Sequence, residues 1–138
     1  MADMNEYNRA IIEEFRAHGG KVGGPFEGTP VLLLTTTGAR SGEQRTTPVV
    51  YLPDGERMVI FASKAGAPEN PAWFHNLRAH PQVTVEVGTE TLKANAVITS
   101  GEERERLFRR QADLQPQFEE YARRTTREIP VIALERAG

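Results

Sequence analysis

Residues 35–48 bring two arginines, several hydroxyl groups and two glycines together in one turn. Their sequence, TTTGARSGEQRTTP, follows the apolar run at 31–34. Glycines let backbone amides come close to a ligand, and guanidinium groups donate strong hydrogen bonds to charged acceptors. The pattern predicts an anion-binding site, although a solvated turn with surface arginines is an open alternative. The candidate ligands are Arg40, Ser41, Gly42, Arg45, Thr46, Thr47 and Pro48.

A second segment, whose residues could bind a ligand, follows the next apolar strand and leads into a short helix. Its sequence, at residues 63–77, is SKAGAPENPAWFHNL. A loop that follows a strand often carries function because the strand holds its backbone groups in place. In the alternative interpretation, Lys64 is a solvated charge and Trp73 packs into the core. The candidate ligands here are Ser63, Lys64, Gly66, Ala67, Pro68, Trp73 and Asn76.

No metal site is expected. His75 has no second histidine or acidic residue at ligand spacing, since the other histidines are His18 and His80. The chain has no cysteine, which excludes disulfides and cysteine-based zinc sites. The run of alternating charge at 102–111 is typical of a solvated helix face, not of a nucleic-acid surface, because its glutamates cancel its arginines.

Apolar periodicity and turn residues predict the elements that position these segments. Strands are predicted at 31–36, 45–52, 58–63, 82–88, 90–98 and 130–135, and helices at 4–18, 71–80, 100–111 and 115–124. Pro48 cannot donate to a strand ladder, which predicts an edge or a bulge there. Asp3 and Glu6 are expected to cap the first helix. Ser100 and Glu103 have the same spacing before the third helix.

Mostly antiparallel strands with short turns and peripheral helices predict an α+β barrel, not a doubly wound sheet. The 138 residues are expected to form one domain, with an N-terminal helix at 1–20 and the barrel at 30–138. A net charge of -2 gives no reason to expect nucleic acid as a partner. The sequence has no apolar run of roughly 18 to 20 residues, so no transmembrane segment is expected. The polar N-terminal residues resemble no signal peptide, and the expected location is cytoplasmic.

Taken in this order on strands of one small barrel, the two segments resemble the cofactor site of the deazaflavin-dependent nitroreductase family, whose members hold coenzyme F-420. The resemblance extends from about residue 30 to the C-terminus and implies a split β-barrel of about six strands, related to flavin-binding barrels. It implies that residues 35–48 hold the phosphate-bearing tail of the cofactor. In the family this segment is usually GRKSG followed by RTTP, so Ala39 and Arg40 leave one cation fewer here. The loop that begins at Ser63 is implied to lie along the deazaflavin ring.

The C-terminal segment YARRTTREIPV, at residues 121–131, also resembles this family. In relatives a helix bearing aromatic residues covers the ring there, and the following strand completes the barrel. Tyr121 is therefore the candidate catalytic residue, as a proton donor to the reacting substrate. The alternative is that Tyr121 covers the core with its hydroxyl group in water.

The resemblance implies an oxidoreductase that uses reduced coenzyme F-420 as hydride donor to a quinone, a nitroaromatic compound or a similar electron-poor acceptor. A barrel that binds flavin mononucleotide (FMN) is one alternative, and a non-catalytic carrier of the cofactor is another. The expected partner is a small-molecule electron acceptor, and a homodimer is a possible assembly. A lipid quinone as acceptor would place the protein at a membrane surface.

Overall fold

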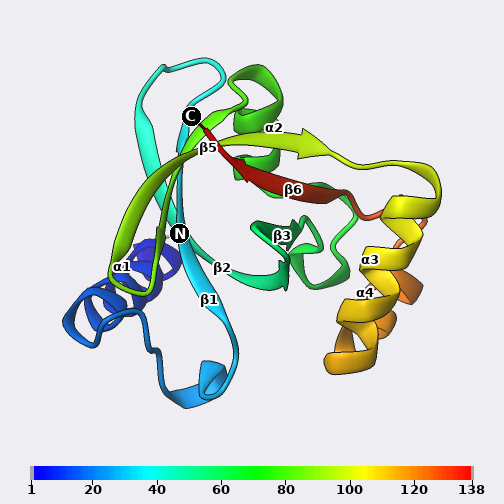
Figure 1. Cartoon of the computed structure of the whole chain (residues 1–138), viewed down its shortest axis with the longest axis horizontal. Coiled ribbons are helices and arrows are strands. Elements are labelled where there is room, and N and C mark those ends of the chain that lie inside the picture. The colour runs from blue at the N-terminus through cyan, green and yellow to red at the C-terminus, as the bar shows by residue number, and fades with distance from the viewer. Residues whose placement is uncertain (1, 138) are drawn as a thin grey trace.

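Six antiparallel strands form a closed barrel in the computed structural model, which describes residues 2–137 (Figure 1). The strand order around the barrel is β1-β2-β3-β6-β5-β4. The strands are β1 (Val31–Thr37), β2 (Gln44–Asp54), β3 (Arg57–Phe61), β4 (Gln82–Val87), β5 (Glu90–Ile98) and β6 (Val131–Arg136). The helices are α1 (Ala2–Ala17), α2 (Ala72–Ala79), α3 (Gly101–Leu114) and α4 (Gln117–Arg124), with short 3-10 turns η1 (Gly24–Phe26) and η2 (Lys64–Gly66). The predicted α+β split barrel is confirmed.

Strand β1 is apolar on both faces because it separates two hydrophobic cores. Leu32 and Leu34 belong to the barrel interior, whereas Val31 and Leu33 pack with residues of α1. Successive side chains of a strand point to opposite faces, and here both faces are covered. Burial of each such side chain contributes about 1.5 to 3 kcal/mol. The continuous apolar run at 31–34 is therefore a strand buried on both sides.

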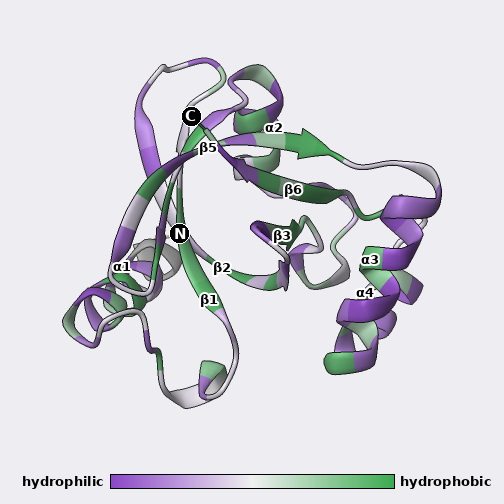
Figure 2. Cartoon of the chain, in the orientation of Figure 1, coloured by the Kyte–Doolittle hydropathy of each residue, from purple (hydrophilic) through white to green (hydrophobic). Residues whose placement is uncertain are grey.

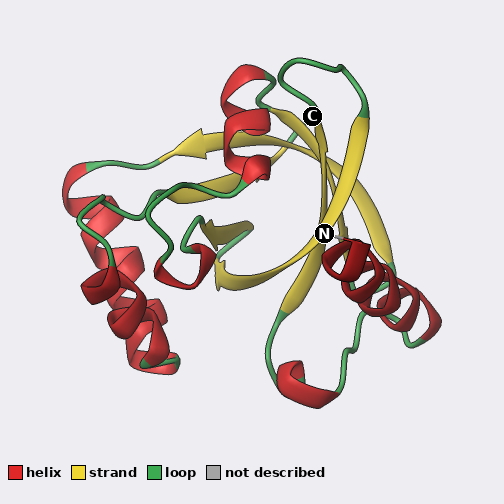
Figure 3. Cartoon of the chain, turned by 180° about the vertical axis from the view of Figure 1, so that it is seen from behind, coloured by secondary structure: helices red, strands yellow, loops and turns green. Residues whose placement is uncertain are grey.

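The helices pack against three parts of the barrel. Figures 1 and 3 show α1 on one side of the barrel and the pair α3 and α4 on the opposite side. Helix α2 contributes Phe74 and Leu77 to the interior core. Leu107 and Phe118, from α3 and α4, pack with Phe61 on the outer face of β3. Hydrophobic residues are concentrated on the strands, whereas α3 and α4 are mostly hydrophilic (Figure 2).

The barrel has an open edge along the first half of β2. Residues 44–50 of β2 pair with β1, but only residues 51–54 pair with β3. Pro48 lies opposite Leu33 in an unbroken register within the first half. It therefore lies at a strand edge and not in a bulge, so the missing N–H of proline removes no ladder hydrogen bond.

Both capping-box predictions are wrong. Helix α1 begins at Ala2, so Asp3 lies inside the helix instead of preceding it. Ser100 does occupy the position before α3, but its side chain makes no capping hydrogen bond. Glu103 instead accepts a hydrogen bond from Arg57, 3.0 Å away. A charge-assisted contact across the fold is thus made in place of the local cap.

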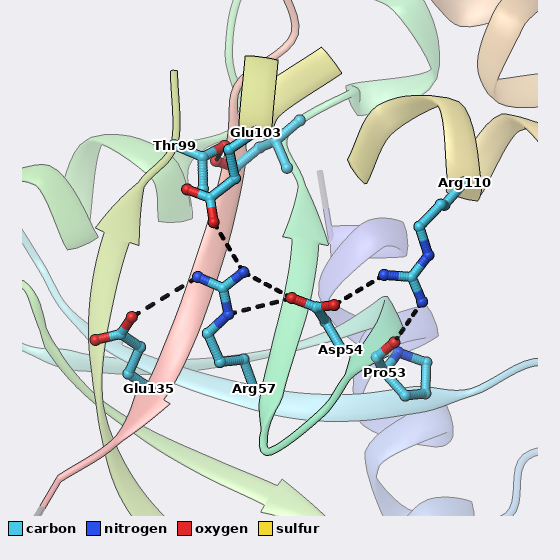
Figure 4. Close-up of polar contacts among 8 residues, drawn as sticks. Pro53, Asp54, Arg57, Thr99, Glu103, Arg110 and Glu135 are labelled. Carbon is cyan, nitrogen blue, oxygen red and sulfur yellow. Dashed lines mark hydrogen bonds and ion pairs between the residues drawn. The ribbon is translucent and has the colours of Figure 1, made fainter. Parts of the chain in front are cut away.

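A cluster of charged residues, which we call the hairpin ion cluster, attaches α3 to the β2–β3 hairpin (Figure 4). Arg57 contacts Asp54 at 2.6 Å, and it also pairs with Glu103 of α3. Arg110 of α3 contacts the other oxygen of Asp54 at 2.8 Å. The hydrogen bond from Arg57, followed by that from Arg110, lowers the pKa of Asp54. The cluster fixes α3, and with it the start of α4, on the barrel.

Candidate functional site

A cleft of about 710 Å³, here called the central cleft, opens along the unpaired edge of β2. Residues from α1, β2, η2, α2 and α4 line it, together with residues of the segment before β1. Its volume is within the range of pockets that enclose small ligands, roughly 300 to 1,000 Å³. The predicted site residues that line it are Thr47, Pro48, Ser63, Lys64, Trp73 and Tyr121.

A second cleft of about 590 Å³, here called the arginine cleft, lies between the β1–β2 turn and α2. The predicted site residues that line it are Arg40, Ser41, Arg45 and Asn76. Ala72, the first residue of α2, lines both clefts. A ligand with an aromatic part and an anionic part can therefore occupy both clefts at once. Another hollow, of about 760 Å³ beside the end of α1, is lined by none of the predicted residues.

Asn76 shapes the arginine cleft through hydrogen bonds within the protein. Its Oδ1 accepts from the backbone N–H of Ala39 at 3.1 Å, and its Nδ2 donates to Oγ1 of Thr36 at 3.2 Å. Asn76 is buried, so an unpaired amide there would be costly. Its polar groups hold the β1–β2 turn against α2. The residue lines the cleft, but its amide is already engaged.

The two arginines of this cleft are exposed to solvent. Arg45 is 3.7 Å from Glu43, and both side chains are well exposed, so this ion pair is weak. Within residues 2–137, Arg40 makes no ion pair. Both guanidinium groups can therefore turn toward an anion at little cost.

Thr46 and Thr47 lie on opposite faces of β2. Thr47 pairs with Leu34 of the interior face and lines the central cleft, whereas Thr46 pairs with Thr35. The hydroxyl groups of Thr46 and Thr35 are 2.7 Å apart and hydrogen-bonded. Successive side chains of a strand point to opposite faces, so the hydroxyl groups of Thr46 and Thr47 point in opposite directions. Of these two threonines, only Thr47 lines a cleft.

The remaining predicted residues support the clefts without lining either of them. Gly42 has φ 73° in the β1–β2 turn, a conformation that glycine adopts without a steric penalty. Gly66 is buried against α4, and a β-carbon there would lie 2.8 Å from the carbonyl oxygen of Tyr121. Ala67 and Pro68 follow in the same loop. Their predicted contacts with a ligand stay predictions.

Lys64 and Ala65 adopt left-handed backbone conformations, with φ of 46° and 53°. This region is strained for residues that carry a β-carbon, and such strain is often found at functional sites. The ammonium group of Lys64 is 2.9 Å from Glu69. The hydrogen bond from Lys64 lowers the pKa of Glu69.

Tyr121 forms part of an aromatic wall on the α4 side of the central cleft. Its ring is 5.2 Å from that of Phe118 and at 64° to it, which is an edge-to-face arrangement. Phe118 in turn packs 5.6 Å from Phe61. Among the residues that the structure describes, the hydroxyl group of Tyr121 has no hydrogen-bond partner. It is therefore available to a ligand.

Arg127 is a residue of the site region that sequence patterns did not single out. Its Nε donates to the carbonyl of Ala67 at 3.1 Å, and its Nη2 donates to that of Ser63 at 2.9 Å. Its Nη1 donates to the carbonyl of Ala62 at 3.1 Å and to Oδ1 of Asn70 at 2.8 Å. These partners lie 57 to 65 positions earlier in the chain, so no local pattern signals them.

Other residues of the central cleft also escaped prediction. Gln115, between α3 and α4, donates a hydrogen bond to Thr29 at 3.3 Å and so connects the two segments at the cleft margin. Phe61 and Phe118 carry an aromatic signal, but that signal is equally typical of core residues. No metal-binding group of acidic residues and histidines exists within residues 2–137, and no helix there has the length and apolar character that membrane spanning requires.

The comparisons with known proteins agree with one another. A family model described as F420H(2)-dependent quinone reductase matches residues 7–136. The F420H(2)-dependent quinone reductase Rv1261c of Mycobacterium tuberculosis (strain ATCC 25618 / H37Rv) is 37% identical over 126 residues, which are 88% of this chain and 85% of that protein.

Two solved structures resemble this chain in both fold and sequence. A structure described as an F420-H2 dependent reductase (FDR-A) has a TM-score of 0.71 at 37% identity, covering 77% of this chain and 94% of that one. Another, described as a domain-swapped dimer, has a TM-score of 0.73 at 34% identity, covering 96% of each chain.

Proposed function

The chain belongs to the F420H(2)-dependent quinone reductase family and is an oxidoreductase that uses coenzyme F420, and we propose that it holds this cofactor across its two clefts. One observation carries the assignment: Ala72 lines both clefts, so the arginine cleft with its exposed arginines adjoins the central cleft with its aromatic wall. An anionic tail fits the first and a flat ring fits the second. The reaction is hydride transfer to a quinone or a similar electron-poor acceptor.

The tail of the cofactor is assigned to the arginine cleft. Arg40 and Arg45 are the cations that line it, and Ser41 adds a hydroxyl group. Charge-assisted hydrogen bonds from guanidinium groups to an anion contribute roughly 1.5 to 3 kcal/mol each. Asn76 keeps the turn that carries Arg40 close to α2.

The ring is assigned to the central cleft, between the edge of β2 and the loop that begins at Ser63. Thr47, Pro48 and Trp73 line this space from β2 and α2, and Lys64 lines it from η2. The bound cofactor supplies the hydride, so the protein must mainly position the reactants and exclude water. The aromatic wall of Phe118 and Tyr121 serves that exclusion.

Tyr121 is assigned as the proton donor to the acceptor. A quinone that accepts a hydride needs one further proton to become the hydroquinone, and negative charge builds on its oxygen as the hydride arrives. A hydroxyl group placed beside that oxygen stabilises this charge more in a dry cleft than in water. The support is that Tyr121 lines the cleft and that its hydroxyl group has no partner within residues 2–137.

Fluorescence titration of the pure protein with F420 and, side by side, with FMN tests the cofactor assignment. We expect F420 to bind at least tenfold more tightly than FMN, which requires about 1.4 kcal/mol. Equal or reversed affinities would contradict it. Oxidation of reduced F420 by a panel of quinones and nitroaromatic compounds tests catalysis, and tight binding without turnover of any acceptor would instead indicate a carrier protein.

The assembly and location are also proposals. A homodimer is supported by the similar structure described as a domain-swapped dimer, and light scattering after size-exclusion chromatography tests it. We propose a cytoplasmic protein that contacts a membrane when its acceptor is a lipid quinone. Co-sedimentation with quinone-loaded vesicles, against quinone-free vesicles, tests this contact.

A further inference from the structure

The loop between β3 and α2 lines the central cleft and carries backbone N–H groups that make no hydrogen bond within residues 2–137. Ser63 has right-handed backbone angles, and Lys64 follows with φ 46°. A right-handed residue followed by a left-handed one makes successive N–H groups converge into a concave site that binds anions. The N–H groups of Ser63, Lys64 and Ala65 have no acceptor within residues 2–137, and all three residues line the central cleft.

Arg127 determines the direction of two of these N–H groups, those of Ser63 and Lys64. In a trans peptide the C=O of one residue and the N–H of the next point in opposite directions. The carbonyls of Ala62 and Ser63 both point to the guanidinium group of Arg127, so the N–H groups of Ser63 and Lys64 point away from it. Arg127 does not line the cleft, whereas Ser63 and Lys64 do.

The arrangement has a cost that Arg127 offsets. Two consecutive residues with β-carbons, Lys64 and Ala65, have positive φ, and this conformation persists only when surrounding contacts hold it. Arg127 supplies four such contacts to the loop. Burial lowers the pKa of Arg127 and the nearby charge of Glu69 raises it, but an arginine stays protonated in any case.

We propose that Arg127 is a positioning residue that holds Ser63, Lys64 and Ala65 in a turn with positive φ at Lys64 and Ala65, and that the N–H groups of this turn bind an atom of partial negative charge on a molecule in the central cleft. The proposal rests on the proposed function for the identity of that molecule. The atom is an oxygen or nitrogen either of the bound cofactor ring or of the acceptor. Arg127 acts through the loop backbone and does not itself touch the ligand.

Hydrogen exchange of the ligand-free protein tests the hold of Arg127 on the loop. The N–H groups of Gly66 and Ala67 donate to the carbonyls of Ser63 and Lys64 within the turn, so they report on it. In Arg127→Met we expect exchange of these two amides to be at least tenfold faster, with barrel amides unchanged. The matched control is Arg123→Met, which removes an exposed arginine of α4 with only surface ion pairs. It should leave both amides as in the parent.

Binding and kinetics identify the source of the bound atom. If the atom belongs to the cofactor, Arg127→Met weakens F420 binding about tenfold, while kcat and the KM of the acceptor change little. If it belongs to the acceptor, F420 binding is unchanged and kcat/KM for the acceptor falls about tenfold. Added to Arg127→Met, the substitution Ala65→Gly should raise the reduced quantity, F420 affinity or kcat/KM, at least threefold, because glycine adopts positive φ without strain. A folded Arg127→Met variant with parent-like exchange, cofactor affinity and acceptor kinetics would overturn the proposal.

Arg127→Lys keeps the test decisive if Arg127→Met does not fold. Lysine keeps the charge but lacks the planar fork, so it cannot reproduce all four hydrogen bonds. We expect faster exchange of Gly66 and Ala67 and weaker binding than in the parent, and parent-like values would contradict the proposal. If the parent itself does not bind F420, the proposed function fails, whereas exchange in the ligand-free protein still decides whether Arg127 holds the turn.

Discussion

Gly66 and Tyr121 are in direct backbone contact. A β-carbon on Gly66 would lie 2.8 Å from the carbonyl oxygen and 3.1 Å from the α-carbon of Tyr121, and Gly66 has φ 83°. The loop that presents Lys64 to the central cleft therefore packs directly on the helix that presents Tyr121. Two residues assigned to the same reaction are positioned by one contact.

Substitution of Gly66 by alanine tests this contact. We expect Gly66→Ala to lower stability by roughly 1 to 3 kcal/mol, because it adds strain and displaces α4, and to lower kcat as Tyr121 moves. Thermal unfolding and quinone reduction are the measurements. Gly55→Ala is the control, since Gly55 has φ 60° but a β-carbon on it would meet no other atom within 4 Å. It should lose stability only through strain and keep its kcat.

Loss of either cation of the arginine cleft should weaken cofactor binding. We expect Arg40→Ala and Arg45→Ala each to reduce F420 affinity by roughly 1.5 to 3 kcal/mol, the contribution of a charge-assisted hydrogen bond. Affinity of the parent should also fall with added salt, because the groups are exposed. Arg109→Ala, an exposed change on α3, serves as control. Parent-like affinity in both folded variants would mean that the turn is only a surface feature.

Removal of the Tyr121 hydroxyl group should affect turnover more than binding. Tyr121→Phe keeps the aromatic ring, so F420 affinity should change little while kcat falls roughly tenfold or more, as for loss of a general acid. Steady-state kinetics with several acceptors measure this, with Tyr7→Phe on α1 as control. Unchanged turnover with every acceptor would make Tyr121 a packing residue.

The hairpin ion cluster predicts how stability depends on pH. The pKa of Asp54 is lower in the folded protein than its ordinary value of 3.8. The ionised carboxylate therefore contributes fully to the free energy of unfolding above pH 3.8, and this contribution is lost as the pH falls through the lower pKa of the folded state. Asp54→Asn should be less stable than the parent by about 1 kcal/mol at neutral pH, and the difference should shrink below pH 3.8. Denaturant unfolding at several pH values measures it, with Asp113→Asn as control. A difference that persists in acid would exclude the ionised carboxylate as the cause.

Strands were largely predictable because their signals are local. Alternation at 82–88 and the apolar run at 31–34 depend on neighbours in sequence, and both segments are strands. The two capping boxes failed for different reasons. The first helix begins at Ala2, ahead of Asp3, and Glu103 accepts a hydrogen bond from Arg57, which is distant in sequence.

The sequence alone determined the family, the barrel and the two segments from which the clefts are built. Only the tertiary structure decided which residues of those segments line the clefts and which residues form hydrogen bonds with one another. Closure of the barrel places Thr47 and not Thr46 at the central cleft, engages the amide of Asn76 and brings Arg127 to carbonyls about sixty positions earlier. The physical reason is that motifs record residue types and spacing along the chain, whereas hydrogen-bond partners depend on distances that exist only after the strands have paired.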